Sequence, residues 1–501
     1  MPHCGRSISG RPQSVRRDRS QRALDGAQAS MTTGTPGAAA LSTPLTNPVA
    51  SLAGWSAIVL ACGDRGAMRS ATPAVLQPIA GVPMVRLVCD LLREVGCQRI
   101  FVVAGAPVEA IAAAAGAGVQ VVGEPAAGGA ASAALAARGA VGDHGNVLIL
   151  RADMPLLSAR TLRELAGRHL AASRVLTFLT AYLDDPHGFG RILRRNGEVQ
   201  GIVREHELTR ALRGQPEVNA GLYAADATWL WAALPLLEPN GNGETSLADL
   251  VARAVARGGV EAYQVSEAVE VQQVGDRQQL ARADRLLRDR IRETLMRDGV
   301  TLMDPPTIYV DAGVAVGVDS TLLPGTHLSG STRIGRGCRI GPNAVLRDMI
   351  VGDGCEIGGS TLEGSTLAEG VTVGPYCHIR PGSTLERDVH LGNYAEVKAS
   401  RIGARTAVGH FSYIGDADVG VDVNVGAGSI TANYDGEQKH RTVIGDRVQL
   451  GSDTVMVAPV TLGADARTAA GAVVVDNVPA GATVMGVPAR MRAADEGGHP
   501  A

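Results

Sequence analysis

An aliphatic side chain recurs at every sixth position through most of the second half of this chain. Such a period fits neither an α-helix, with about 3.6 residues per turn, nor a half-buried strand, with a repeat of about 2, but it fits one flat side of a triangular β-helix. Each coil of about three six-residue units would stack its aliphatic side chains into one interior, with Gly or Asp-Gly at the corners. The series predicts a parallel β-helix of hexapeptide repeats, in its left-handed form, over residues 299–487. It runs through Leu367, Val373, Ile379, Leu385, Leu391 and Val397, restarts at Ile402, Val408 and Ile414, then at Val419 and Val425, and finally at Ile444, Leu450, Met456 and Leu462, with Thr468 and Val474 in phase.

Length and charge restrict the remaining possibilities. A chain of 501 residues is too long for one hydrophobic core and favours two or three domains. A formal net charge of -3 provides no global field that would gather nucleic acid or an anionic membrane. The sequence has no apolar run of about 18 residues, no secretory signal at its start and no C-x-x-C pair among its seven cysteines. We therefore expect a cytoplasmic protein without membrane insertion, nucleic-acid partner, disulfide framework or zinc site.

The first half of the chain has a different pattern of residues, without the six-residue repeat. Residues 1–52 have the composition of a disordered tail. The basic stretch 16–22 within it is predicted to be a solvent-exposed segment and not a nucleic-acid site, and Met31 is an alternative first residue. Residues 53–275 alternate buried-type strands with helical segments, which predicts a Rossmann-like α/β domain. Residues 276–298 predict an amphipathic linker helix, and 488–501 a frayed tail. The strands are expected at 57–61, 99–104, 119–122 and 147–150, and helices at 83–95 and 130–138.

Four segments of the solenoid carry residues that a stacking repeat does not need. HIRPGS, AEVKAS, VGHFSYIGDA and NVGAGSITANYDGEQKHRT bring cations and a histidine onto successive coils, where they can converge on one groove suited to a phosphorylated substrate. The unperturbed pKa of a histidine suits His410 to proton transfer from an amine, although a corner histidine that caps a turn gives the same pattern. Residues 431–442 break the six-residue count, and an insertion that costs regularity favours a functional role.

These segments, with GNYAEVKASRIG, IGDRVQLGSDTVMVAPVTLG and AAGAVV, resemble in order and spacing the bifunctional bacterial enzyme family N-acetylglucosamine-1-phosphate uridyltransferase/glucosamine-1-phosphate acetyltransferase. The resemblance spans residues 57–487. It implies a homotrimer with acetyl-CoA as co-substrate, and His410 as the general base that deprotonates the amine of glucosamine 1-phosphate. It also implies sugar-phosphate ligands at Arg380, Lys398, Tyr413, Asn424 and Lys439, and an acetyl-CoA site at Ala427, Asn433, Tyr434, Ser452 and Ala470. The family's late arginine is Gly486 here, which leaves Arg490 or Arg492 as substitutes.

The front domain departs further from this family. Its opening segment AIVLACGDRGAMRSATPAVL resembles a nucleotidyltransferase signature, a strand followed by a phosphate-cradling loop and a helix. Two family cations there are Ala67 and Ala74, and each such contact to a departing pyrophosphate is worth about a hundredfold to a thousandfold in rate. The departures continue along the domain. The family's Gly-Thr-Gly-His is Gly128-Gly129-Ala130-Ala131 in this chain, and its Tyr-Gly-Asp is Arg151-Ala152-Asp153. The family's sugar-binding Glu is Arg204 here, and its metal-binding Asn is Gly275.

What the front domain retains is mostly structural. Asp153 is kept as an expected Mg²⁺ ligand, and glycines and apolar residues are kept that a fold needs for packing. The residues that the resemblance implies for nucleotide-sugar binding are Leu60, Ala61, Cys62, Gly63, Gly190 and Asn219; Cys62 reads as a small buried hydrophobe instead of a nucleophile.

Three hypotheses follow. The favoured one is an acetyltransferase whose front domain is weak or inactive in uridylyl transfer. The second is a fully bifunctional enzyme that also uses UTP and Mg²⁺, in which Arg65, Arg69 or Arg151 replaces the missing cations. The third is a non-catalytic sugar-nucleotide binder or assembly partner, which would predict losses in both halves.

Overall fold

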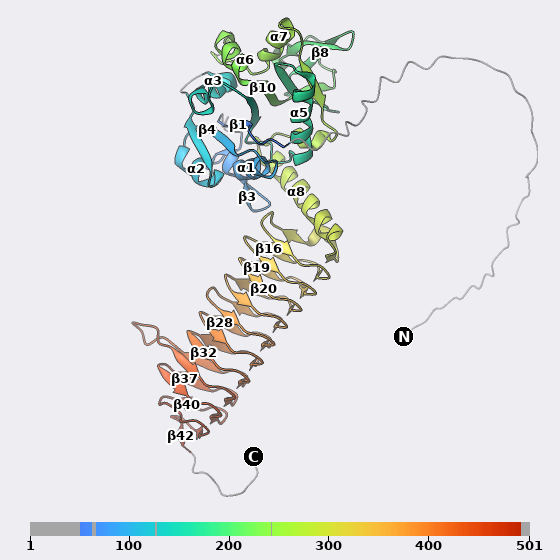
Figure 1. The fold of residues 1–501 in the computed structure, drawn as a ribbon. Coiled ribbons are helices and arrows are strands. Elements are labelled where there is room, and N and C mark those ends of the chain that lie inside the picture. Colours follow the sequence, from blue (N-terminus) through green and yellow to red (C-terminus); the bar gives the residue numbers. More distant parts are fainter. Residues whose placement is uncertain (1–50, 63–66, 126–127, 242, 492–501) are drawn as a thin grey trace, which may run out of the picture. The chain divides into compact units, whose positions relative to one another are not determined.

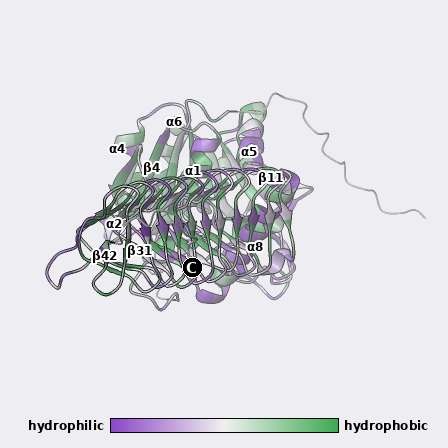
Figure 2. Cartoon of the chain, turned by 90° about the horizontal axis from the view of Figure 1, so that it is seen from below, coloured by the Kyte–Doolittle hydropathy of each residue, from purple (hydrophilic) through white to green (hydrophobic). Residues whose placement is uncertain are grey.

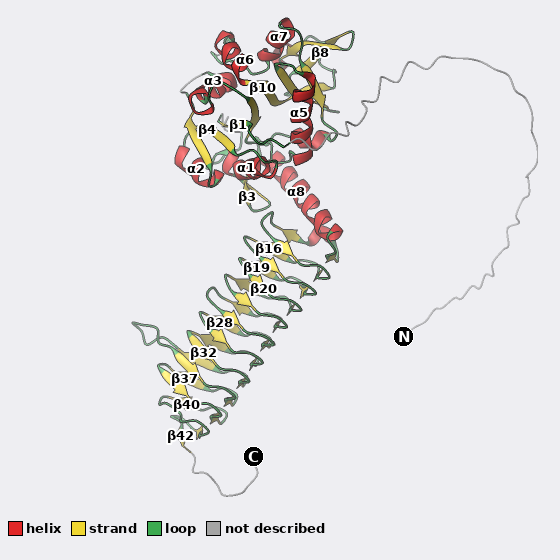
Figure 3. Ribbon diagram, viewed as in Figure 1, coloured by secondary structure: helices red, strands yellow, loops and turns green. Residues whose placement is uncertain are grey.

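The computed structural model describes residues 51–62, 67–125, 128–241 and 243–491 (Figure 1). Gly63, Arg65, Met31 and Arg492 therefore lie outside the described residues, as does most of the predicted N-terminal tail. Among the described residues the α-helices all lie before residue 298, and beyond it the chain consists of short strands joined by loops and one 3-10 turn, Pro305–Thr307 (Figure 3). No helix in the described ranges is both long and apolar enough to cross a membrane.

A mixed sheet forms the centre of the front domain, in the order β11-β7-β10-β6-β1-β4-β5. The predicted strands are present as β1 (Ser56–Ala61), β4 (Arg99–Ala104), β5 (Val119–Gly123) and β6 (Asn146–Arg151), all parallel to one another. The later strands run as β7 (Leu176–Tyr182), β10 (Glu217–Asp226), which is antiparallel to β6 and β7, and β11 (Glu261–Gln264). The hairpin of β8 (Arg191–Arg195) and β9 (Glu198–Val203) extends β10.

Helices cover both faces of this sheet because its strands are apolar on both sides. In β1, Val59 belongs to one core and Ile58 to the other, as expected when successive side chains point to opposite faces. One face packs against α1 (Met84–Glu94), α2 (Val108–Ala115) and α5 (Ala159–Ala172). The other packs against α3 (Gly129–Ala136), α4 (Arg138–Val141), α6 (Ala227–Ala233) and α7 (Asp249–Ala256).

The predicted linker helix is α8 (Arg277–Arg297). The side chain of Asp276 caps its first turn by accepting a hydrogen bond from the backbone N–H of Gln279. Leu280 and Leu287 pack against a small cluster with Met84 and Leu156, whereas Leu295 belongs to the solenoid core.

Short strands from β12 (Thr301–Leu302) to β40 (Val473–Val474) build three parallel sheets, and every third strand along the chain belongs to the same sheet; β41 (Thr483–Met485) and β42 (Arg490–Met491) then extend one of these sheets. Thr372 in β24 (Thr372–Val373) pairs with His390 in β27 (His390–Leu391), one coil and 18 residues later. The coils stack behind one another in Figure 2, with hydrophobic and hydrophilic residues following each other along the chain. This arrangement confirms the predicted α/β domain followed by a left-handed parallel β-helix.

The interior of the solenoid consists of the side chains that the six-residue series singles out. Every member from Leu367 to Val474 is at most 7% exposed. The break in the series is a projecting loop between β34 (Ile430–Ala432) and β35 (Thr442–Ile444), visible beside the solenoid in Figure 1, in which Tyr434 and Lys439 form an antiparallel bridge. β42 pairs with β41 (Thr483–Met485) in antiparallel fashion and so extends regular structure beyond residue 487.

Candidate functional site

One corner of the solenoid carries the predicted general base and part of the predicted coenzyme site in a single column. His410 lies between β30 (Ala407–Val408) and β31 (Tyr413–Gly415), and its carbonyl accepts a hydrogen bond from Gly428, the neighbour of Ala427. The carbonyl of Ala427 accepts a hydrogen bond from the backbone N–H of Asp453, the neighbour of Ser452. The carbonyl of Ser452 in turn accepts one from the backbone N–H of Gly471, the neighbour of Ala470. The corner therefore stacks His410, Ala427, Ser452 and Ala470 on consecutive coils.

The imidazole of His410 is exposed and has one side-chain partner from the coil before it. Its Nδ1 contacts Oδ1 of Asn393, whose carbonyl also accepts the backbone N–H of Phe411. An amide oxygen at Nδ1 requires that nitrogen to carry the proton, which leaves Nε2 as the unprotonated atom. This tautomer suits proton abstraction at Nε2.

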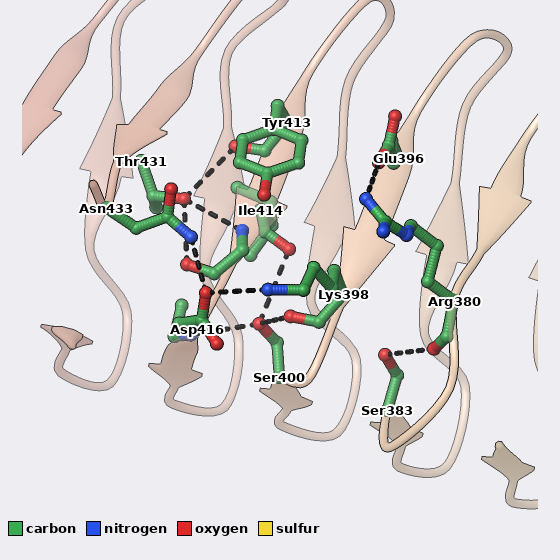
Figure 4. A network of polar contacts seen from close by, with 12 residues as sticks. Arg380, Ser383, Glu396, Lys398, Ser400, Tyr413, Ile414, Asp416, Thr431 and Asn433 are labelled. Carbon is green, nitrogen blue, oxygen red and sulfur yellow. Dashed lines mark hydrogen bonds and ion pairs between the residues drawn. The ribbon is translucent and has the colours of Figure 1, made fainter. Parts of the chain in front are cut away.

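The flat face that follows this corner carries the predicted cations (Figure 4). Arg380 follows β25 (His378–Ile379) and donates to Glu396 of β28 (Glu396–Lys398) at 3.1 Å. Lys398 Nζ lies 3.1 Å from Asp416 Oδ2, the same oxygen that accepts from Asn433. Tyr413 pairs in register with Glu396, so its ring belongs to the same face. The structure thus brings Arg380, Lys398 and Tyr413 together on adjacent strands.

Lys439 reaches this cluster from the projecting loop. Its pKa is lowered because its ammonium group lies against that of Lys398, with a further contribution from Arg380. The pKa of Lys398 is raised, because the Asp416 carboxylate 3.1 Å away stabilises its charged form. Two adjacent ammonium groups with a single shared carboxylate form a local excess of positive charge suited to a phosphate group.

The other predicted residues have different positions. Asn424 lies on β33 (Asn424–Val425) in another of the three sheets, so a single chain does not bring it onto the face of Lys398. Asn433 is buried against Asp416, whereas Tyr434 is 60% exposed at the base of the loop.

A second candidate site is a cavity of about 420 Å³ in the front domain. Its walls include the predicted residues Leu60, Gly190 and Asn219, together with Arg151 and Arg204. The amide of Asn219 donates to the hydroxyl of Tyr223 at 2.7 Å. Ala61 is buried at the end of β1 and does not line this cavity.

Asp153, the predicted Mg²⁺ ligand, is held by an arginine. Arg151 donates from Nε to Oδ1 at 2.9 Å and from Nη2 to Oδ2 at 2.5 Å. Within the described ranges, no group of three His, Cys, Asp or Glu side chains is arranged to hold a metal ion. Burial, followed by the nearby Glu124 carboxylate, raises the pKa of the Cys62 thiol to about 12, which suits a packing role and not a nucleophile.

The residues that sequence reasoning missed are the partners of those it named. Asn393, Glu396 and Asp416 hold His410, Arg380 and Lys398 in place. Asn393 and Glu396 lie within the conspicuous segment GNYAEVKAS, and Asn393 precedes His410 by 17 residues, one coil. Counting one coil back from His410, and one coil forward from Arg380 and Lys398, would have found them.

Comparison with known proteins agrees with both halves of this description. A family model described as the MobA-like NTP transferase domain matches residues 57–198. The protein called bifunctional protein GlmU from Geotalea uraniireducens is 39% identical over 431 residues, 85% of this chain and 94% of the relative. Those from Pelobacter propionicus and Geobacter sulfurreducens are each 41% identical, over 441 and 449 residues. They cover 86% and 85% of this chain, and 95% and 94% of their own lengths. This chain therefore belongs to the bifunctional GlmU family, the glucosamine-1-phosphate acetyltransferases and N-acetylglucosamine-1-phosphate uridyltransferases that its sequence resembles.

Proposed function

We propose that this protein transfers the acetyl group of acetyl-CoA to the amine of glucosamine 1-phosphate, and that its front domain is weak or inactive in uridylyl transfer. The observation that carries the acetyl transfer is the corner column, which stacks His410 directly on the predicted coenzyme residues beside a face rich in cations. The product, N-acetylglucosamine 1-phosphate, serves the biosynthesis of UDP-N-acetylglucosamine, and a cytoplasmic location fits that role.

The chemistry follows from the tautomer of His410. As the amine nitrogen attacks the thioester carbonyl, Nε2 accepts a proton from that nitrogen. A C–N bond forms, the C–S bond breaks, and coenzyme A leaves as a thiol once its sulfur regains a proton from the imidazolium. Asn393 acts through His410 by fixing its ring orientation, and is a positioning residue.

Recognition of the sugar phosphate is assigned to the cluster of Arg380, Lys398 and Lys439, with Tyr413 on the same face. Glu396 and Asp416 hold two of these cations in position without neutralising all three. Asn424 lies on another sheet and would reach the substrate only from a neighbouring coil corner or a second chain.

Coenzyme binding is assigned to Ala427, Ser452 and Ala470 along the column, and to Asn433 and Tyr434 at the base of the loop. Met485 pairs with Arg490 in the final hairpin, so Arg490 lies across from the neighbour of Gly486. We assign the missing family arginine to Arg490 on this basis.

A homotrimer is part of the proposal because the same corner is strongly apolar on its outside. Tyr376, Tyr394 and Phe411 stack with ring centroids 5.2 and 5.1 Å apart while 64%, 49% and 66% exposed. Three contiguous exposed rings form a patch typical of a protein interface. Sedimentation of a species of three chains would support this assignment, and a monomer at working concentration would contradict it.

The alternative is full bifunctionality, including transfer of UMP from UTP to N-acetylglucosamine 1-phosphate. The retained cavity lined by Leu60, Gly190 and Asn219 favours it, as does membership of a family named for two activities. The Arg151–Asp153 pair and the alanines at 67 and 74 favour the weak front domain. A non-catalytic binder or assembly partner is the least supported, because every group expected to handle the amine and the sugar phosphate is present.

The experiment that tests the acetyl transfer is thiol release from acetyl-CoA with and without glucosamine 1-phosphate. Release that depends on the amine substrate is expected. Thiol at the level of the substrate-free blank would overturn the proposal.

A further inference from the structure

The front domain has a position where a divalent cation would be expected, but its ligands do not fit one. The backbone N–H of Val274 donates to the carbonyl of Asp153 at 3.0 Å, so Gly275 lies beside Asp153. Gly275 has no side chain to offer, and Asp153 is the remaining carboxylate of the expected pair. A cation at this point would have one side-chain ligand where the resemblance implies two.

That single ligand is also fully engaged. Arg151 binds both carboxylate oxygens, Oδ1 through Nε at 2.9 Å and Oδ2 through Nη2 at 2.5 Å. The side chain of Asp153 is only 14% exposed, and the guanidinium that binds it belongs to a side chain that is 38% exposed. A bidentate arginine–carboxylate pair is among the strongest ion pairs available to a protein. A metal ion would have to displace it and then face the positive charge of the displaced guanidinium.

Arg151 also lines the front cavity, so its charge lies at the binding region and not behind it. Asp153 accepts two of the five N–H donors of the guanidinium. An arginine on Asp153 leaves the pair neutral, whereas a divalent cation on the same carboxylate would leave one positive charge. The substitution therefore removes both the metal and the net charge that would stabilise a departing pyrophosphate.

We propose that Arg151 is a built-in replacement for the divalent cation at Asp153, and that its guanidinium excludes Mg²⁺ from the front domain. The inference concerns the front domain alone and goes beyond the proposed acetyl transfer. It predicts that removing the arginine and restoring a second ligand creates a metal site.

The test uses the full chain and Mn²⁺ as the probe, with bound metal measured by the loss of the free-ion signal in electron paramagnetic resonance. The variants are Gly275→Asn and Arg151→Ala combined with Gly275→Asn, and Asp153→Asn is added to the wild type and to each of these two. Asparagine is tolerable at 275 because a Cβ there would lie 3.6 Å from Gln279 Oε1, an ordinary contact.

We expect no Asp153-dependent Mn²⁺ site in the wild type or in the single Gly275→Asn variant. The Arg151→Ala, Gly275→Asn variant should gain one site, bound about tenfold or more tightly than in the single variant, and Asp153→Asn should remove it. Circular dichroism establishes that each variant is folded.

Three outcomes would overturn the inference. The first is an Asp153-dependent Mn²⁺ site in the wild type. The second is equal binding by the single and double variants, which would make Arg151 no obstacle. The third is a folded double variant that gains no site. Thiol release by the same samples is measured separately, so a failure here is distinguishable from a failure of the acetyl-transfer proposal.

Discussion

At His410 a single neighbour decides what the imidazole can do. With Nδ1 directed at the amide oxygen of Asn393, Nε2 is the basic atom. We expect His410→Ala to lower kcat for acetyl transfer by about 10² to 10⁴, the usual contribution of general acid–base catalysis. His390→Ala is the matched control, because His390 is an exposed histidine of a neighbouring coil whose ring bonds to the hydroxyl group of Thr372. Turnover in His410→Ala equal to that of the control would remove His410 from its role.

Lys439 gives the acetyl transfer a predicted alkaline pH dependence. Its pKa is lowered by contact with Lys398, so it loses its proton at a lower pH than an ordinary lysine. Because the charged form binds phosphate, KM for glucosamine 1-phosphate should rise as pH increases through that lowered pKa. Lys439→Arg should move the rise to higher pH, since arginine stays protonated. An unchanged KM profile in the arginine variant would show that Lys439 does not bind the phosphate.

The named residues and their partners differ in how far the sequence predicts them. The motifs alone identify His410 and Lys398, but Asn393 and Asp416 become visible as their partners only once the coil length is known. That length varies between about 16 and 18 residues for ordinary coils, because each corner can hold one residue more or fewer. Corner geometry is not encoded in the six-residue period, so side-chain pairing between coils needs the structure.

Within a coil, stability depends on the inward aliphatic side chain. Ile414 is fully buried beneath Tyr413 and contacts the stacked interior above and below. We expect Ile414→Ala to lower the free energy of unfolding by about 2 to 5 kcal/mol. Ile350→Ala is the control, since Ile350 is 56% exposed on the same solenoid and should change stability by less than about 0.5 kcal/mol. Urea denaturation measures both, and equal losses would contradict the assigned inward register.

Helix α5 introduces a pH-dependent contribution to stability. His169 is 4% exposed, lies 3.0 Å from the Thr177 hydroxyl, and burial lowers its pKa to about 4. Between pH 6.5 and 4 the unfolded chain takes up a proton that the folded chain refuses, so stability is full above about 6.5 and falls as pH decreases. The loss approaches about 3 kcal/mol at pH 4. His169→Gln should flatten this part of the stability profile, and a variant with the wild-type slope would contradict the assignment.

The elements themselves were largely predictable. β1 and β4 fall within a residue of the predicted strands because buried apolar runs are short and bounded. The expected helix at 130–138 is instead α3 followed by α4, with a break at Ala137 that an alanine-rich segment does not signal. Strand order in the front sheet also required the structure, because β10 inserts between β6 and β7 through contacts distant in sequence.

At the scale of the whole molecule, the front domain and the solenoid are both regularly folded, but they differ in how many of the expected functional residues they keep. The solenoid combines the proposed base, a cation cluster and the proposed coenzyme column, whereas the front domain holds its one expected metal ligand in an ion pair with Arg151. The sequence predicts this asymmetry through its substitutions, but the Arg151–Asp153 contact is a structural finding. Arg151 is the last residue of β6 and Asp153 lies in the turn that follows it, where the two side chains meet.

The most direct test of the central claim is a pair of assays on one purified sample. Thiol release is measured with acetyl-CoA and glucosamine 1-phosphate, and pyrophosphate release with UTP, N-acetylglucosamine 1-phosphate and Mg²⁺. The account predicts thiol release without pyrophosphate release. Pyrophosphate release at a rate comparable to thiol release, or the absence of thiol release, would contradict it.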